Sequence, residues 1–341
     1  MSRTVPVDEA VGMVLPHDVT EIRKGEFKGR AFRKGHIIRA GDIEHLKRLG
    51  KEHIYVLELG PDDVHENEAA QLMAAALAGE GTEVSGEPVE GKLSIVADRD
   101  GLLRVDVEAL FRFNLLGEVM CATLHNNTPV RKGEIIAGTR LIPLLAKRRV
   151  VEEAVAVARQ AGGILRVAAL RKARAGLVIT GNEVFHGRIK DAFEPVLRGK
   201  LEQLGSQVVQ VRFAPDDAGI IAEEIRACLA AGADLIVTSG GMSVDPDDVT
   251  RMGIAQAGAR DIAYGTPVLP GAMFLVGYLD QVPVLGLPAC GMFHKITVFD
   301  LVLPRILAGE KIGRPELAAM GHGGLCRTCK TCLYPACGFG K

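Results

Sequence analysis

Residues 233–250 bring together an apolar run, two adjacent glycines and several aspartates, a set that can bind an anion together with a metal ion. The run at 235–237 is short and rich in β-branched residues, which predicts a buried strand. Ser-Gly-Gly follows at 239–241, and glycine lets an anion approach the free N–H groups where a helix begins. A phosphate beside the aspartates of 245–248 needs a cation between them, so the loop indicates a phosphate with a divalent metal. An ordinary strand-to-helix loop with aspartate caps explains the segment equally well.

The elements that must position this loop alternate along residues 171–310. Strand and helix patterns follow one another with short connections, which predicts an α/β domain with a doubly wound, mostly parallel sheet. The predicted strands cover 176–180, 207–213, 235–238, 273–278 and 282–287; the predicted helices cover 193–204, 216–229, 247–256 and 291 to about 307.

Carboxylates follow several of these predicted strands. Glu183 comes after the first strand, and the pair Asp216 and Asp217 comes after the second. Asp248 follows the third strand, in the loop described above. Ligands of such sheets bind at the carboxyl ends of the strands, so these acids should share one edge. An acidic edge beside glycine-containing loops fits a phosphate ester bound through Mg²⁺, while a helix N-cap is the alternative role for Asp216.

The N-terminal half reads as two smaller α+β, strand-rich domains. Its predicted strands lie near 37–38 and at 54–59, 93–96, 102–105, 118–124 and 135–145; its predicted helices cover 43–49, 64–80, 108–114 and 146–161. Residues 81–91 are polar and glycine-rich, which predicts a connection. The predicted division is a small α/β unit at 1–62, a strand-rich domain with a linking helix at 63–170, the α/β domain at 171–310 and a cysteine-rich tail at 311–341.

Composition excludes several classes of partner. The formal net charge is −1 and aromatic residues make up 4% without tryptophan, which argues against a nucleic-acid surface and an anionic membrane. The first residues lack a basic-then-apolar signal pattern, and no uncharged apolar run is long enough to span a bilayer. We therefore expect a cytoplasmic protein.

The cysteines fall into two groups. Cys121, Cys228 and Cys290 stand alone in apolar surroundings, as small reduced core residues do. The others crowd the end of the chain with spacings of two, two and four residues: Cys326, Cys329, Cys332 and Cys337. Four thiols so close together favour a metal over free thiols, and the spacing leaves [4Fe–4S] and Zn²⁺ open, with a slight preference for the cluster.

The loops of the α/β domain together resemble the molybdopterin-binding domain shared by molybdopterin adenylyltransferases, molybdopterin molybdenumtransferases and gephyrin. The matching pieces are TGNE at 180–183, GRIKD at 187–191, the pair at 216–217, TSGGMSV at 238–244, PG at 270–271 and LP at 287–288. They occur in the family's order. Residues 32–56 also resemble a unit of the molybdenumtransferase N-terminal region.

The resemblance implies a ligand of the molybdopterin type, in its free or adenylylated form, and a homo-oligomer. Glu183, Asp217 and Asp248 correspond to the family's acidic metal and catalytic positions. The implied ligand-binding residues are Thr180, Gly181, Asn182, Ser239, Gly240, Gly241, Ser243, Pro270, Gly271 and Pro288. The implied reaction is Mg²⁺-dependent insertion of molybdate into adenylylated molybdopterin.

Departures from the family pattern favour a second function. Asp245 stands where the family has a glycine, and both lysines that flank the family's Pro-Gly turn are replaced, by Leu269 and Ala272. The molybdenumtransferase segment Asp-Asn-Ser-Ala-Met-Asp-Gly-Tyr-Ala has no counterpart. The alternative is a non-catalytic carrier or sensor of the finished cofactor, with the cysteine tail as a metal switch. An iron–sulfur electron carrier is a third possibility.

Overall fold

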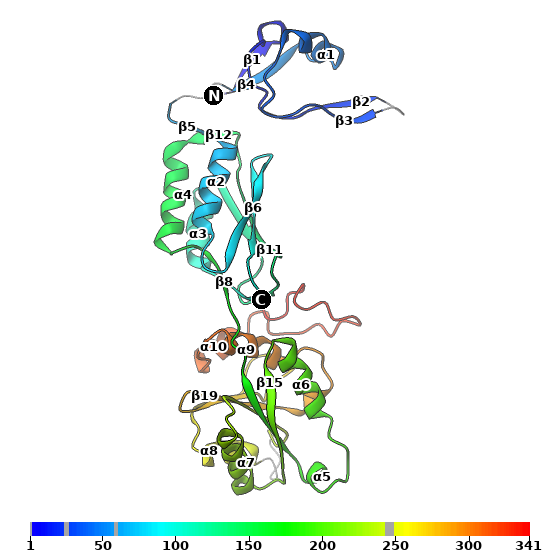
Figure 1. Cartoon of the computed structure of the whole chain (residues 1–341), viewed down its shortest axis with the longest axis vertical. Coiled ribbons are helices and arrows are strands. Elements are labelled where there is room, and N and C mark those ends of the chain that lie inside the picture. Colours follow the sequence, from blue (N-terminus) through cyan, green and yellow to red (C-terminus); the bar gives the residue numbers. More distant parts are fainter. Residues whose placement is uncertain (1, 24–26, 58–60, 243–248) are drawn as a thin grey trace. The chain divides into compact units, whose positions relative to one another are not determined.

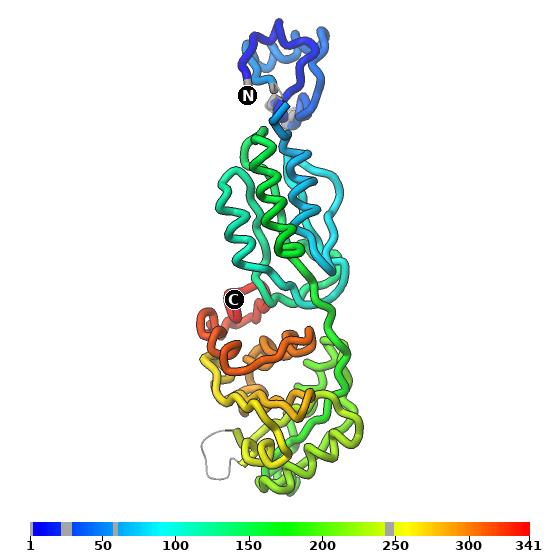
Figure 2. Tube along the Cα trace, turned by 90° about the vertical axis from the view of Figure 1, so that its left-hand side faces the viewer, coloured from blue at the N-terminus to red at the C-terminus, as the bar shows by residue number. Residues whose placement is uncertain are grey.

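The computed structural model describes residues 2–23, 27–57, 61–242 and 249–341 (Figures 1 and 2). The chain divides into two compact units. The first consists of Met1–Asp98, Val105–Leu124 and Lys132–Val167, and the second of Arg99–Arg104, His125–Arg131 and Ala168–Lys341. None of the described helices is long and apolar enough to cross a membrane. The finer, four-part division expected from the sequence stays a prediction.

The first unit begins with two small antiparallel pairs. Strand β1 (Ser2–Pro6) pairs with β4 (His53–Leu57), and β2 (Val19–Arg23) pairs with β3 (Phe27–Phe32). The helix expected at 43–49 is confirmed as α1 (Ile43–Arg48). The strand expected near 37–38 is wrong, because Ile37 forms only an isolated bridge to Val14.

The remainder of the first unit contains a four-stranded antiparallel sheet in the order β6-β7-β11-β9 and a separate antiparallel pair of β5 and β12. The elements of this part of the unit are β5 (Asp63–His65), α2 (Glu66–Leu77), β6 (Thr82–Val89), β7 (Lys92–Ala97), α3 (Val107–Leu115), β9 (Val119–Thr123), β11 (Ile135–Leu141), β12 (Leu145–Lys147), α4 (Arg148–Gln160) and β13 (Leu165–Ala168). The connection expected at 81–91 is wrong, since most of it is β6. This edge strand pairs on one side only and exposes most of its side chains, so its sequence is as polar as a loop.

The second unit is built on a six-stranded sheet in the order β15-β14-β16-β19-β18-β17. Its parallel strands are β14 (Arg174–Thr180), β15 (Gln207–Ala214), β16 (Leu235–Ser239) and β19 (Val282–Leu287). Strands β18 (Leu275–Leu279) and β17 (Arg260–Tyr264) extend it antiparallel, and β17 was not expected. Two short strands, β8 (Gly101–Val105) and β10 (Pro129–Val130), pair separately. The mixed α/β class is therefore confirmed.

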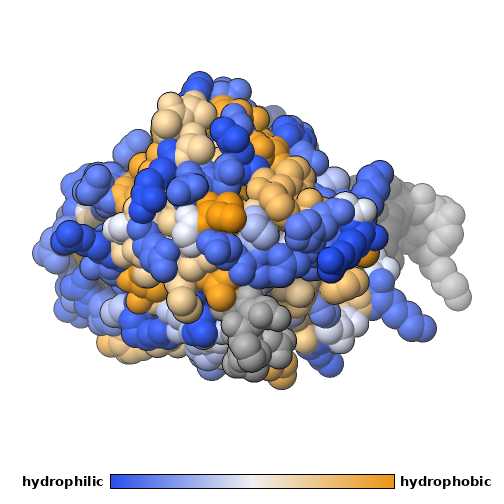
Figure 3. All heavy atoms as spheres, turned by 90° about the horizontal axis from the view of Figure 1, so that it is seen from below, coloured by the Kyte–Doolittle hydropathy of each residue, from blue (hydrophilic) through white to orange (hydrophobic). Residues whose placement is uncertain are grey.

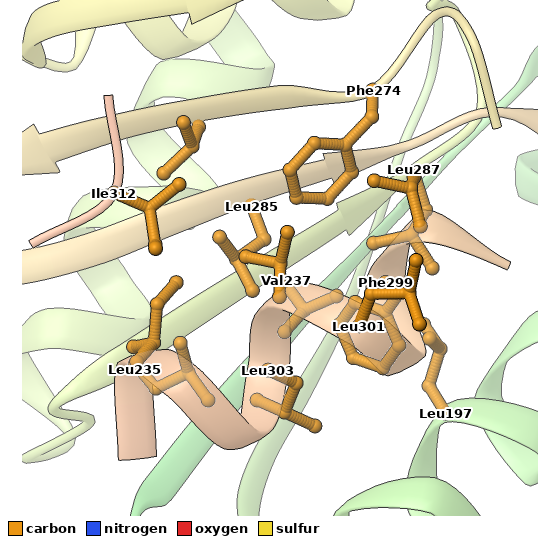
Figure 4. Packing of buried hydrophobic residues seen from close by; sticks show 14 of the residues in the cluster. Leu197, Leu235, Val237, Phe274, Leu285, Leu287, Phe299, Leu301, Leu303 and Ile312 are labelled. Carbon is orange, nitrogen blue, oxygen red and sulfur yellow. The ribbon is translucent and has the colours of Figure 1, made fainter. Parts of the chain in front are cut away.

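Alternate residues of the central strands point to opposite faces of this sheet. Leu235 and Val237 enter the cluster shown in Figure 4, together with α6 (Phe193–Gln203), α9 (Val298–Leu307) and α10 (Arg314–Ala319). Ile236 enters a second cluster with α7 (Ala218–Ala230) and α8 (Thr250–Gln256). Each fully buried Leu, Ile or Val contributes about 1.5–3 kcal/mol. The central strands are therefore fixed from both faces, and so are the loops at their ends.

The helix expected from 291 begins later. A short 3₁₀ turn covers Ala289–Met292, and α9 starts only at Val298. Thr297 sets that start, because its hydroxyl accepts from the Phe299 N–H at 3.3 Å while its own N–H donates to Asp300 at 2.7 Å. Helix α10 was not expected.

Candidate functional site

The loops after β14 and β16 meet at a pair of threonine hydroxyls. Thr180 ends β14 and its Oγ1 donates to the Ser239 carbonyl at the end of β16, at 2.8 Å. The same oxygen lies 2.9 Å from the hydroxyl of Thr250, the first residue of α8. Since a hydroxyl has one hydrogen, Thr250 must donate to Thr180. Two strands and one helix are thereby joined at the carboxyl-end edge of the sheet.

Gly240 and Gly241 pack against this hydroxyl pair. Both have positive φ, 86° and 54°. A Cβ on Gly240 would lie 2.5 Å from the Thr180 carbonyl oxygen, and a Cβ on Gly241 would overlap the Thr250 hydroxyl. Glycine is therefore required here by the packing of the chain itself, in addition to any close approach of a ligand.

The loops after β14 and β15 are linked by reciprocal hydrogen bonds. The Asn182 N–H donates to Asp216 Oδ2 at 2.9 Å, and the Asp216 N–H donates to Asn182 Oδ1 at 3.3 Å. Asp217 caps α7, since its Oδ1 accepts from the Ile220 N–H at 2.9 Å. The helix N-cap suggested for Asp216 is thus made by Asp217, because α7 begins two residues later than expected.

Glu183 lies in α5 (Asn182–Phe185), and its side chain is exposed. Its carboxylate lies next to Gly181, because a Cβ added at Gly181 would be 2.9 Å from Glu183 Oε1. Gly181 has a φ of 136°, which favours glycine at this position. Asp217 is exposed on the neighbouring loop, so two of the three predicted acids lie at the same edge with carboxylate oxygens open to solvent. Asp248 and Ser243 lie outside the described residues, as does Asp245.

The Pro270-Gly271 turn reaches the same edge from the antiparallel side. Leu275 of β18 pairs with Gly286 near the end of β19, which brings the residues before β18 to the carboxyl end of the parallel strands. The Leu269–Pro270 peptide is cis, and the Pro270 carbonyl accepts from the Val298 N–H at 3.3 Å. Pro288 precedes the 3₁₀ turn after β19. The Pro270-Gly271 turn is held against the start of α9 by the hydrogen bond from Val298.

Several residues of this edge were not singled out by sequence reasoning. The Tyr264 hydroxyl donates to the Met242 carbonyl at 2.7 Å, and the Arg251 guanidinium lies 4.2 Å from the centre of the Tyr264 ring. The Met242 side chain is buried against Gly286. These contacts join residues far apart in sequence, so no local sequence motif predicts them. The Ser239 hydroxyl is fully buried and has no hydrogen-bond partner within the described part of the chain.

The surface around α5 and α7 is a mosaic, seen from below in Figure 3: hydrophilic residues cover most of it, with scattered hydrophobic ones between them. The exposed apolar residues near α5 include Phe185 and Ile189. The loops at the edge also expose large apolar side chains at Leu269 and Phe293.

The isolated cysteines behave largely as expected. Burial raises the pKa of Cys121 to about 12 and that of Cys228 to about 11, so both are inert core thiols. Cys290 is only half-buried, although burial also raises its pKa. The expectation of a core residue is therefore wrong for Cys290, which follows the exposed Ala289 outside the sheet.

Neither predicted metal site is assembled among the described residues, where no group of three or more His, Cys, Asp or Glu could hold an ion. In the tail, Cys326 and Cys337 pack against the apolar cluster of Figure 4, Cys332 is half-buried and Cys329 is exposed. Mg²⁺ at the acids and a metal at the tail cysteines both stay predictions.

A mixed α/β unit whose glycine loops meet at the carboxyl ends of parallel strands has the architecture of a ligand-binding domain. Residues 176–308 match a family described as "Probable molybdopterin binding domain", so the resemblance to that domain is confirmed for this segment. Residues 4–58 match a family described as a domain of unknown function.

Curated relatives share a short segment with this chain. A CinA-like protein of Mycobacterium sp. (strain MCS) is 37% identical over 94 residues, which is 28% of this chain and 22% of the relative. A CinA-like protein of Mycobacterium leprae is 38% identical over 90 residues, which is 26% of this chain and 21% of the relative. The chain thus spans about a fifth of the length of these relatives.

Two solved structures are similar to part of the chain. CinA of Thermoplasma acidophilum, a protein of unknown function, is 22% identical with a TM-score of 0.33 and covers 35% of this chain and 90% of its own. The molybdopterin biosynthesis enzyme MoaB of Thermus thermophilus is 18% identical with a TM-score of 0.32 and covers 40% of this chain and 98% of its own.

Proposed function

We propose that the second unit binds a molybdopterin-type ligand at the carboxyl-end edge of its parallel strands, and that the protein acts in molybdenum cofactor biosynthesis. One observation carries the proposal. The segment that matches the molybdopterin-binding family, 176–308, is the segment whose Thr180, Gly240 and Gly271 loops meet at that edge. If the motif residues of the matched segment lay at different ends of the sheet, the match to the family would not indicate a single binding site.

The residues of the edge suit a phosphate-bearing ligand. The backbone N–H group of Gly241 would donate to the phosphate, whereas that of Gly240 already donates to the Leu287 carbonyl at 3.4 Å. The buried Ser239 hydroxyl, without a partner in the described structure, supplies a further donor or acceptor. Buried hydroxyls are costly when unpaired, so a ligand that pairs with it gains affinity.

The donor set also suits Mg²⁺, which prefers oxygen ligands and keeps several waters. Glu183 and Asp217 offer exposed carboxylates on loops that Asn182 and Asp216 hold together. Asp217 keeps one oxygen beyond the one bound to the Ile220 N–H. With Asp248, these residues would hold the ion, which neutralises the phosphate when bound.

The reaction we propose is Mg²⁺-dependent insertion of molybdate into adenylylated molybdopterin. Purified protein is incubated with adenylylated molybdopterin, molybdate and Mg²⁺, and formation of the finished cofactor is measured. Wild type and Asp280→Asn, which changes an exposed aspartate of the β18–β19 turn, should be active. Asp248→Asn should lose most activity. If both substitutions leave turnover unchanged, or if wild type is inert, the catalytic assignment is wrong.

A specific observation favours the second candidate, a non-catalytic carrier or sensor of the cofactor. Leu269 and Ala272, which flank the Pro270-Gly271 turn, are both exposed, so this turn offers no positive charge to molybdate. Tight binding of finished cofactor without turnover would establish the carrier. Failure to bind any pterin would remove both functions. A homo-oligomer is proposed for either, and light scattering measures it.

A further inference from the structure

The last residues of the chain form a closed loop that docks on the candidate site. The Gly340 N–H donates to the Gly323 carbonyl at 2.9 Å, which closes the loop around 324–339. At its entry, the Leu269 N–H donates to the Gly324 carbonyl and the Cys326 N–H donates to the Leu269 carbonyl, both at 2.8 Å. Leu269 immediately precedes the Pro270-Gly271 turn, so the loop is tied to a motif of the site.

The exit of the loop is held by apolar packing. Phe339 is 5% exposed and belongs to the cluster of Figure 4. Gly340 lies so close to α9 that a Cβ there would be 2.5 Å from a methyl of Leu301. Both ends of the loop are therefore fixed on the second unit.

The interior of the loop is held mainly by Tyr334, whose side chain packs against the cluster of Figure 4. Residues 327–338 form no helix or strand, and most of their side chains are exposed or half-exposed. Irregular loops longer than about 12–15 residues are uncommon in compact domains unless they serve a function. Small units without a core of their own are commonly stabilised by a metal or by disulfides.

The cysteines are distributed to supply such a link. Cys326 and Cys337 pack against the same apolar cluster and stand near the fixed ends, while Cys329 and Cys332 lie on the interior. Residues 324–341 contain Arg327, Lys330 and Lys341 and no acidic residue. A centre of four thiolates carries net negative charge, and this basic surrounding complements it.

We propose that residues 324–340 bind one metal centre through the thiolates of Cys326, Cys329, Cys332 and Cys337, and that this centre braces the Pro270-Gly271 turn. Each thiol releases its proton on coordination. Zn²⁺ and a [4Fe–4S] cluster share this four-thiolate chemistry. Coordination draws the two interior cysteines to the two that are already fixed, and it immobilises the Cys326 backbone that holds Leu269.

Metal content tests the centre without any pterin. The full chain is purified anaerobically, and zinc, iron and acid-labile sulfide are measured together with the visible spectrum. We expect about one zinc ion, or about four iron and four sulfide, per chain. Cys329→Ser and Cys332→Ser should each lose most of the metal, while Cys290→Ser, a half-buried thiol outside the loop, should retain it.

The centre is overturned if wild type binds neither zinc nor a cluster, as purified or after reconstitution with each. It is also overturned if both tail substitutions retain the full metal content. The visible spectrum distinguishes Zn²⁺ from a [4Fe–4S] cluster, because only the cluster absorbs visible light.

Amide hydrogen exchange tests the bracing. Exchange of the Leu269 and Cys326 amides should slow when the metal is present, whereas that of the Thr250 amide should not change. Equal exchange with and without metal would overturn the bracing. That bracing this turn matters for ligand binding rests on the proposed function. The metal centre and the proposed function can fail separately. A protein that holds the metal and binds no pterin would contradict only the proposed function.

Discussion

The glycine loops and the cysteine loop are both irregular segments of the second unit, yet they are held in different ways. The loops around Thr180 and Gly240 are fixed by strands packed on both faces and by tight contacts that allow no added atom. The cysteine loop is fixed by backbone hydrogen bonds at its two ends and by the packing of Tyr334 between them. The difference teaches that one edge of the domain is preorganised by the fold itself, whereas the adjoining loop is held at a few points, and we propose that a metal supplies a further link.

The sharpest test of this contrast compares the thiols. In chelator-treated protein at pH 8, exposed Cys329 should react with iodoacetamide at least 1,000-fold faster than Cys228. With a pKa of about 11, only about one Cys228 thiol in 1,000 is ionised at that pH, and burial blocks the reagent further. Mass spectrometry of the labelled peptides measures both rates. Comparable labelling would contradict the rigid packing of the sheet.

Next in size is Phe339→Ala, which should release the exit of the cysteine loop. Truncating a buried phenylalanine costs about 3 kcal/mol, or about a 100-fold increase in local opening. In metal-free protein, tryptic cleavage after the exposed Arg327 and Lys330 should accelerate accordingly. Leu333→Ala, at a position 59% exposed, is the control and should change little. Equal cleavage in both variants would show that Phe339 does not anchor the loop.

Gly240→Ala tests the preorganised edge. The new Cβ would meet the Thr180 carbonyl at 2.5 Å and would sit at a φ of 86°. Gly205→Ala has a φ of 76° with open space around the new atom, so it bears the backbone strain alone. Gly240→Ala should therefore be destabilised by about 2 kcal/mol more than the control, as measured by urea unfolding. A smaller difference in unfolding free energy would mean that the backbone around Thr180 shifts at little cost to make room for the new Cβ.

The smallest expected effect is that of Thr180→Val. The substitution keeps the side-chain shape and removes the hydroxyl between Ser239 and Thr250, which should cost about 1–2 kcal/mol. Thr20→Val, at an exposed threonine, should be close to neutral in the same urea titration. An unchanged unfolding midpoint for Thr180→Val would show that the hydroxyl pair does not hold the two strands together.

The sequence predicted the elements with strong periodicity and missed those decided by distant partners. Helix α4 was found because its apolar residues repeat with the helical period, and strand β16 because its apolar run is short and β-branched. Strand β6 was missed since an edge strand has no need of apolar residues on both faces. Helix α9 was placed too early because the Thr297 cap, rather than the apolar run, decides where it begins.

The arrangement of the loops around the candidate site was predicted to a similar extent. Parallel strands bring their carboxyl ends together, so the meeting of the Thr180 and Gly240 loops followed from element order alone. Tyr264 and Thr250 escaped notice because their partners arrive through tertiary contacts. The spacing of the tail cysteines indicated a metal, but nothing local indicated that Cys326 would bond to Leu269.

The two ends of the loop between β16 and α8 have a consequence for evolution. The Thr250 N–H donates to the Gly241 carbonyl at 3.3 Å, so the segment between them begins and ends at neighbouring points of a rigid frame. Doubling the length of a loop with fixed ends costs only about 0.6 kcal/mol. Selection can therefore change the length of this segment or its charged residues while the frame stays unchanged. Relatives that share the frame can therefore differ in this segment.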